Sequence, residues 1–170
     1  ANDLPGRLEG IRAAWLEMMG PFPPEKPALD VQMRRVDDIE GMECHHLSFQ
    51  SEPGDRVPAY LLVPKGARPG PSPALVCPHP TSAGAGKSQC VGLTGKAPGD
   101  PPLPAERSRA YGLELARWGY VTISIDLFGD GERIPEGFTH YDSEPFYKRH
   151  PEWSLFGKNA WDCMRAVDVL

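Results

Sequence analysis

The chain has 170 residues, of which 40% are hydrophobic and 24% charged, and its formal net charge is −5 at pH 7. This length fits one globular domain with a buried core. The mild negative charge gives no reason to expect nucleic acid or an anionic membrane as a partner. The sequence contains no run of 18 apolar residues, about the length that a helix needs to span a bilayer.

The N-terminal residues predict an amphipathic helix. Leu8, Ile11, Trp15 and Met18 recur at intervals of three or four residues and therefore share one helical face. The Gly/Pro-rich sequence that follows ends this helix. We expect residues 1–30 to form a helical extension of a single domain, 1–170. The first residues do not resemble a signal peptide, which slightly favours the cytoplasm over export with a removed leader.

Three strands are predicted next. They lie near residues 31–40, 43–50 and 57–63, and a Pro-Gly-Asp turn before the third favours an antiparallel hairpin. Alternation of side chains gives the second strand two faces, with Leu47 on one and Cys44 on the other.

The second half of the chain predicts a pair of parallel strands. A short apolar run at 73–79 is typical of a buried strand, and the clearest strand of the sequence covers 120–125. Between them we expect a long loop, 80–104, and a helix, 105–118, that ends at Gly119. A strand, a helix and a second strand in this order imply parallel neighbours in one sheet.

The last predicted element is a helix that starts near Leu155. Its Phe156, Ala160, Met164 and Val167 share one face. No strand follows this helix in the sequence, although a doubly wound sheet normally continues from such a helix. We therefore expect the domain to be incomplete at its C-terminal end.

No spacing of cysteine and histidine matches a zinc site, and neither a metal nor an organic cofactor is predicted. The four cysteines form no C-x-x-C pair, so we expect structural thiols. Four histidines belong to no metal-binding spacing, and we expect them to be packed or exposed rather than to bind metal: His45, His46, His140 and His150.

Several segments, in their order and spacing, resemble the α/β-hydrolase superfamily. Many members have a His-Gly pair where this chain has His79-Pro80-Thr81-Ser82 after a strand. Residues 110–121 look like the helix before the superfamily's fourth strand, and residues 126–132 look like its D-x-x-G-x-G turn. Residues 161–170 resemble the helix before the nucleophile strand. The N-terminal helix and hairpin look most like the acetyl xylan esterase and dienelactone hydrolase branch.

The resemblance implies an α/β fold, the N-terminal half of an α/β-hydrolase domain, in which an antiparallel hairpin leads into a parallel sheet with flanking helices. It also implies a carboxylic-ester hydrolase that acts by serine acyl transfer on small or carbohydrate acetyl esters. A related serine peptidase is the alternative enzyme. The expected partners are a small-molecule ester and the C-terminal half of the same enzyme, on the same or a separate chain.

The triad itself is not expected in this chain. In the superfamily the nucleophile lies in a G-x-S-x-G turn after the next strand, followed by the acid and the histidine. The sequence stops before such a turn, so the resemblance places all three residues beyond Leu170. The nearest substitute is Ser82, but Pro80 stands two positions before it, where the strained turn needs a small residue.

The loop after the strand 73–79 is expected to supply a backbone donor to the oxyanion hole, as this loop does in the superfamily. Pro80 has no N–H. The donor is therefore expected to be Thr81 or, as a second choice, Ser82, in a loop that begins at His79.

The D-x-x-G-x-G turn is expected to be structural. We expect Asp126 to accept hydrogen bonds from backbone N–H groups of the turn. Gly129 and Gly131 are expected to supply positive φ values.

A nucleotide-binding protein is the alternative from another class. Residues 81–88 follow a strand and end in Gly-Lys-Ser, as a phosphate-binding loop does. Such a loop requires glycine where this chain has Thr81, and a helix directly after it. We therefore expect Lys87 not to bind phosphate. A non-catalytic fragment or binding module is the third hypothesis.

Overall fold

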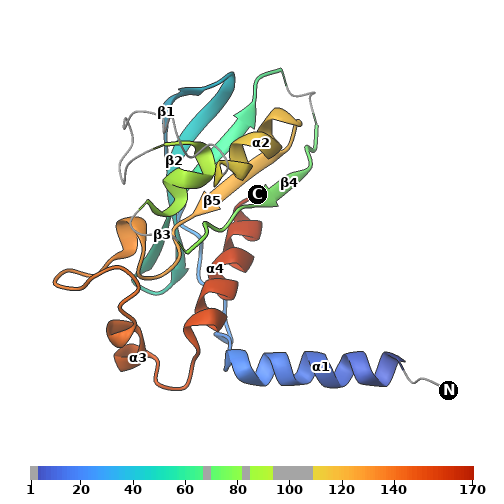
Figure 1. The fold of residues 1–170 in the computed structure, drawn as a ribbon, viewed down its shortest axis with the longest axis vertical. Coiled ribbons are helices and arrows are strands. Elements are labelled where there is room, and N and C mark those ends of the chain that lie inside the picture. The colour runs from blue at the N-terminus through green and yellow to red at the C-terminus, as the bar shows by residue number, and fades with distance from the viewer. Residues whose placement is uncertain (1–3, 67–69, 82–84, 94–108) are drawn as a thin grey trace.

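The computed structural model of the chain describes residues 4–66, 70–81, 85–93 and 109–170. Its strands form one five-stranded sheet (Figure 1). They are β1 (Gln32–Ile39), β2 (Met42–Glu52), β3 (Asp55–Pro64), β4 (Ala74–Val76) and β5 (Val121–Ile125). The order across the sheet is β1-β2-β3-β5-β4, in which only the β4–β5 pair is parallel. The predicted hairpin and the predicted parallel pair are both confirmed.

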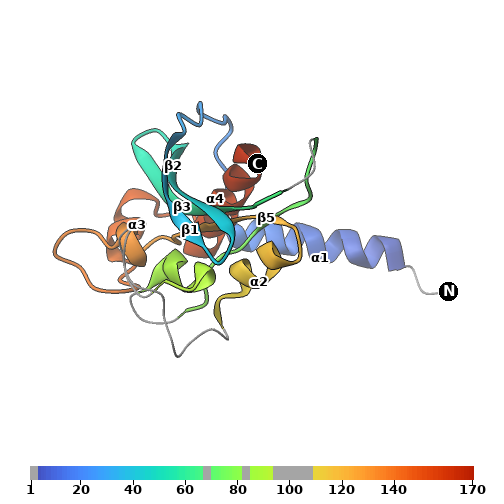
Figure 2. The same cartoon turned by 90° about the horizontal axis from the view of Figure 1, so that it is seen from above.

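Helices cover both faces of this sheet. The helical elements are α1 (Leu4–Met19), η1 (Gly86–Val91), α2 (Tyr111–Arg117), η3 (Gly131–Arg133), α3 (Glu144–Arg149) and α4 (Leu155–Val169). Figure 2 shows η1 and α2 together on one side of the sheet. The helix α4 packs against the other side and contacts β2, β4 and β5. The result is a three-layer α/β/α arrangement, as an α/β-hydrolase fold requires.

Each face of the sheet has its own apolar core. On the α2 side, Cys44 of β2 and Leu62 of β3 pack with Leu113 of the helix. On the α4 side, Leu47 of β2 and Ile123 of β5 belong to a second cluster. The two faces separate because successive side chains of a strand point to opposite sides, as predicted for β2.

Three elements differ from their predicted extents. The predicted helix 105–118 begins only at Tyr111, because Ala110 before it has a non-helical ψ of 43°; residues 105–108 lie outside the described residues. The predicted loop 80–104 contains the 3₁₀ helix η1. The predicted strand 73–79 is shortened to the three residues of β4.

The chain between β5 and α4 also contains the short helix α3, for which the sequence shows no periodic signal. Proline lies in its first turn, a position that needs no N–H hydrogen bond, and Phe146 anchors it in the core. Phe146 contacts the rings of Phe128 and Trp153. A single buried aromatic residue therefore holds a helix too short to show a period.

The apolar face that the sequence predicted for α4 is not the face that packs against the sheet. Phe156 is 63% exposed and Val167 60% exposed. The buried side of the helix carries Lys158, Asp162 and Arg165 together with Trp161 and Ala166. Charged side chains can occupy this side because each has a partner of opposite charge: Lys158 pairs with Asp162, and Arg165 pairs with Asp168.

The helix α1 extends away from the sheet at the N-terminal end of α4 (Figure 1). None of its residues is buried. Its Trp15 lies 6.1 Å from Phe156 of α4, measured between ring centroids. The predicted apolar stripe of α1 and the apolar face of α4 are therefore exposed together. Among the described residues, no helix is long and apolar enough to cross a membrane.

The four cysteines are free thiols, and three of them are buried. Burial raises the pKa of Cys77 to about 11 and that of Cys90 to about 12. Both thiols are therefore protonated at neutral pH, which fits a packing role and not that of a nucleophile.

Candidate active site

The candidate site lies at the edge of the sheet where β4 and β5 end. These two strands are parallel, so the residues that follow Val76 and Ile125 emerge on the same side. His79 follows the first strand and Asp126 follows the second. In open α/β sheets, ligands bind in the crevice outside the carboxyl ends of the strands.

His79 joins the two loops at this edge. Its side chain is buried, and its Nε2 accepts a hydrogen bond from the backbone N–H of Leu127, at 3.1 Å. The Nδ1 atom must then carry the proton, and it lies 3.0 Å from the carbonyl oxygen of Pro80. The loop after β4 is thus fixed to the loop after β5.

The two candidates for the oxyanion-hole donor are Thr81 and Ser82. Thr81 is exposed, directly after Pro80 at this edge. Ser82 lies outside the described residues. A further anchor of the loop comes from α2, where the Tyr111 hydroxyl donates a hydrogen bond to the carbonyl of Pro78. The backbone before Thr81 is therefore held from two sides.

Asp126 is fully buried and organises the turn after β5. Its Oδ1 accepts a hydrogen bond from the backbone N–H of Lys87 at 2.7 Å, and its Oδ2 accepts one from that of Glu132 at 3.0 Å. Gly129 and Gly131 have φ values of +82° and +57°. The bond from Glu132 and the two positive φ values agree with the expectation for this turn, whereas the donor Lys87 belongs to η1 and was not expected.

Two glycines are needed because the Asp126 carboxylate leaves no room for a side chain. A Cβ atom added at Gly86 or at Gly131 would lie 2.2 Å from its Oδ1. Any larger residue would push this carboxylate away from its partners. The segment after β4 and the turn after β5 are therefore packed against each other around one carboxylate.

Lys87 completes this arrangement from η1. The side chain is only 1% exposed, and its Nζ lies 2.7 Å from Asp126 Oδ2 and 2.5 Å from Glu132 Oε1. The lysine of a phosphate-binding loop must reach the phosphates of a bound nucleotide. This ammonium group is instead neutralised inside the protein, which argues against the nucleotide-binding alternative.

Glu132 contributes a pH-dependent part of the stability. Burial alone would raise the pKa of Glu132, but hydrogen bonds from His46 and Lys87 outweigh it and lower the pKa from 4.5 to about 2. The ionised carboxylate therefore stabilises the fold above about pH 4.5, and this contribution is lost as the pH falls towards 2. We expect Glu132→Gln to flatten the decline of stability between these pH values.

Urea unfolding midpoints measured from pH 7 to pH 2.5 test this expectation. The exposed Glu136, in the loop after η3, offers the matched control Glu136→Gln. An acid profile of Glu132→Gln as steep as that of the wild type would contradict the role given to this carboxylate.

A second charge cluster, centred on the buried Lys158, joins α4 to the β2–β3 hairpin. Lys158 Nζ lies within 2.8 Å of four oxygen atoms, which belong to Ser51, Glu52, Asp55 and Asp162. This lysine is 1% exposed. The β2–β3 hairpin and α4 are therefore joined by ion pairs.

Arg133 ties this cluster to the turn after β5. It donates hydrogen bonds to Asp162 Oδ2 at 2.7 Å, to Asp55 Oδ2 at 2.9 Å and to the carbonyl oxygen of Asp126 at 3.1 Å. This role could not be predicted from the sequence, because the partners of Arg133 come from three separate segments. The only sign of this role in the sequence is the position of Arg133 directly after the D-x-x-G-x-G turn, 126–132.

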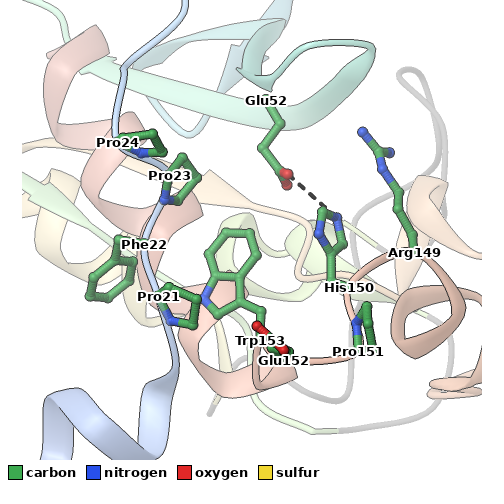
Figure 3. A pocket seen from close by; sticks show the side chains of 10 residues that line it. All are labelled: Pro21, Phe22, Pro23, Pro24, Glu52, Arg149, His150, Pro151, Glu152 and Trp153. Carbon is green, nitrogen blue, oxygen red and sulfur yellow. Dashed lines mark ion pairs between the residues drawn. The ribbon is translucent and has the colours of Figure 1, made fainter.

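A separate cavity of about 350 Å³ lies at the end of the β2–β3 hairpin (Figure 3). It is lined by residues 21–24, by Glu52 and by residues 149–153. Inside it, His150 Nε2 lies 3.4 Å from Glu52 Oε2. Glu52 belongs to β2, and in the sheet order β3 and β5 lie between β2 and β4. Because Ala59 near the start of β3 pairs with Ile125 at the end of β5, the cavity lies at the same edge of the sheet as His79 and Thr81 but is displaced along it.

The fold is that of known esterases. An acetyl xylan esterase, so assigned, from Bacteroides fragilis matches with a TM-score of 0.73 and 23% identity, covering 94% of this chain and 41% of that one. An acetyl xylan esterase from Paenibacillus sp. R4 matches with a TM-score of 0.52 and 19% identity, covering 99% and 47%. A glucuronoyl esterase from Solibacter usitatus matches with a TM-score of 0.52 and 18% identity, covering 96% and 47%.

No protein-family model and no curated protein gives a significant match to the sequence. The chain spans less than half the length of the esterase structures that it matches. At these identities the likeness establishes the fold. The chain therefore has the fold of the N-terminal part of an α/β-hydrolase domain, as the sequence motifs predicted.

Proposed function

We propose that this chain is part of a carboxylic-ester hydrolase that acts by serine acyl transfer. The observation that carries the proposal is the sheet order β1-β2-β3-β5-β4, with the loop after β4 fixed at its carboxyl edge by His79. The same part of the fold occurs in the matched acetyl xylan and glucuronoyl esterases.

The nucleophile strand would lie beside β4. In the described residues β4 ends the sheet, with β5 on one side and no strand on the other. The helix α4 packs across the sheet and contacts β4. A strand that followed this helix could pair in parallel with the free edge of β4, and its carboxyl end would then face the loop of Thr81.

The proposed chemistry divides between this chain and residues beyond it. A serine outside residues 1–170, activated by a histidine that an acid orients, attacks the ester carbonyl. The developing negative oxygen then accepts hydrogen bonds from backbone N–H groups. In this scheme the residue after the serine supplies one donor and Thr81 supplies the other. The proposed substrates are small or carbohydrate acetyl esters, in line with the names of the matched enzymes.

Hydrolysis of p-nitrophenyl acetate by the complete protein tests the proposal. We expect turnover by the complete protein and none above a denatured control by residues 1–170 alone, because the triad is proposed to lie outside them. The isolated segment should also aggregate or bind its missing part, since the outer face of α4 is apolar and exposed.

Two results would contradict the proposal. A complete, folded protein without esterase activity on any acetyl ester would remove the proposed function. Turnover by residues 1–170 that is abolished by Ser82→Ala would identify Ser82 as the nucleophile and place the chemistry inside this chain.

A further inference from the structure

A buried carboxylate beside the candidate site contacts two histidines. Asp130 is fully buried, and its Oδ1 accepts a hydrogen bond from the N–H of Gly131 at 2.7 Å. The same oxygen lies 3.1 Å from Nδ1 of His140, and Oδ2 lies 3.5 Å from Nδ1 of His79. Asp130 thus links His140 to the histidine that fixes the loop of Thr81.

This contact determines which atom of His140 can bind a ligand. An ionised carboxylate only accepts hydrogen bonds, so Nδ1 of His140 carries the proton. In the neutral ring Nε2 is then an acceptor, and it lies on the side of the ring away from Asp130. The His140 side chain is 26% exposed, and among the described residues its Nε2 has no hydrogen-bond partner.

The loop that carries His140 is held in a fixed conformation. Tyr141 has a φ of +59°, which is uncommon for a bulky residue. Its N–H donates to the carbonyl of Gly129 at 2.8 Å, and its ring lies 3.9 Å from that of His140, between centroids. Strained backbone of this kind is concentrated at functional sites, where the surrounding structure imposes it.

We propose that His140 is a substrate-contact residue, whose Nε2 accepts a hydrogen bond from a hydroxyl group on the alcohol part of the ester. This inference rests on the proposed function. The arrangement suits such a contact because the acceptor is oriented in advance by Asp130 and lies at the same sheet edge as Thr81. A carbohydrate ester has hydroxyl donors beside the acyl group, and a simple aryl ester has none.

The experiment compares two esters in the complete protein. One is a monoacetylated methyl xyloside, which keeps free hydroxyl groups, and the other is p-nitrophenyl acetate. His140→Phe keeps a flat ring and removes the acceptor. We expect kcat/KM for the xyloside to fall about tenfold, the cost of one ordinary hydrogen bond. For p-nitrophenyl acetate the change should stay within about twofold.

His45 provides a matched control. It is also partly buried beside a carboxylate, 3.6 Å from Glu43, but it lies within β2, away from the carboxyl edge of β4. We expect His45→Phe to leave the ratio of the two kcat/KM values unchanged. An unchanged melting temperature shows that each variant is folded.

The outcomes separate this inference from the proposed function. If the wild type hydrolyses neither ester, the proposed function fails and takes the inference with it. If the wild type is active but His140→Phe changes neither rate, or lowers both equally, only the inference fails. Nitrogen-15 NMR of the wild type gives a second test, because an Nε2–H form of His140 would also overturn it.

Discussion

Replacing Lys158 by methionine is expected to lower the free energy of unfolding by about 3–5 kcal/mol, the usual cost of removing one partner from a buried charge cluster. Lys158 is the only cation that contacts all three carboxylates of its cluster in the described structure, those of Glu52, Asp55 and Asp162. Arg133 would remain beside two of these carboxylates. Three negative charges would then share one cation, which contacts only Asp55 and Asp162.

Urea unfolding of the protein that contains this chain, followed by tryptophan fluorescence, measures the effect. The control is Lys148→Met on α3, whose exposed ion pair with Glu144 should contribute too little to move the midpoint. The loss in Lys158→Met should shrink in acid, because a protonated carboxylate no longer needs a cation. If the urea midpoint of Lys158→Met at pH 7 equals that of the wild type, the cluster does not stabilise α4.

The sheet could be predicted from the sequence because its signals are local. The strands β2 and β3 show alternation on either side of a Pro-Gly turn, and β5 is a short apolar run that follows a glycine with a φ of +96°, Gly119. The start of α4 is also local, since Ser154 accepts a hydrogen bond from the N–H of Gly157. Each of these features depends on residues within a few positions of one another.

The packed face of α4 could not be predicted in the same way. Periodicity identifies apolar residues, and on α4 these are the exposed ones. The residues that the helix buries are charged, and the partners that allow this lie far away in the sequence, such as Ser51, 107 positions before Lys158. A hydrophobic pattern contains no information about which distant carboxylate will neutralise a lysine.

The turns around the candidate site could be predicted from the sequence, but the contacts of several side chains there could not. The motifs identified His79 and Asp126 and the glycines of the turn. They gave no sign that Lys87 would be buried against Asp126 or that His140 would contact Asp130, ten positions before it. A glycine in a motif indicates that a side chain would not fit at that position, but only the structure shows that the carboxylate of Asp126 occupies the space.

The largest expected effect on catalysis comes from the backbone of Thr81. Thr81→Pro removes the proposed N–H donor, and the loss of one oxyanion-hole donor costs roughly a hundred- to a thousandfold in kcat, or about 3–4 kcal/mol. Thr81→Ala keeps this N–H, so we expect a loss of about tenfold at most. The side chain is exposed and should matter little for packing.

Steady-state kinetics of the complete protein on p-nitrophenyl acetate separate the donor from other roles. The value of kcat should fall much more than KM changes, because the donor acts on the developing oxyanion and only weakly on the bound ester. Proline can also distort the loop, so the comparison requires an unchanged melting temperature. The contact between His79 Nε2 and the N–H of Leu127 holds the preceding residues in place and limits that distortion. If well-folded Thr81→Pro keeps a near wild-type kcat, Thr81 is not the donor, and the N–H of Ser82 becomes the next position to test.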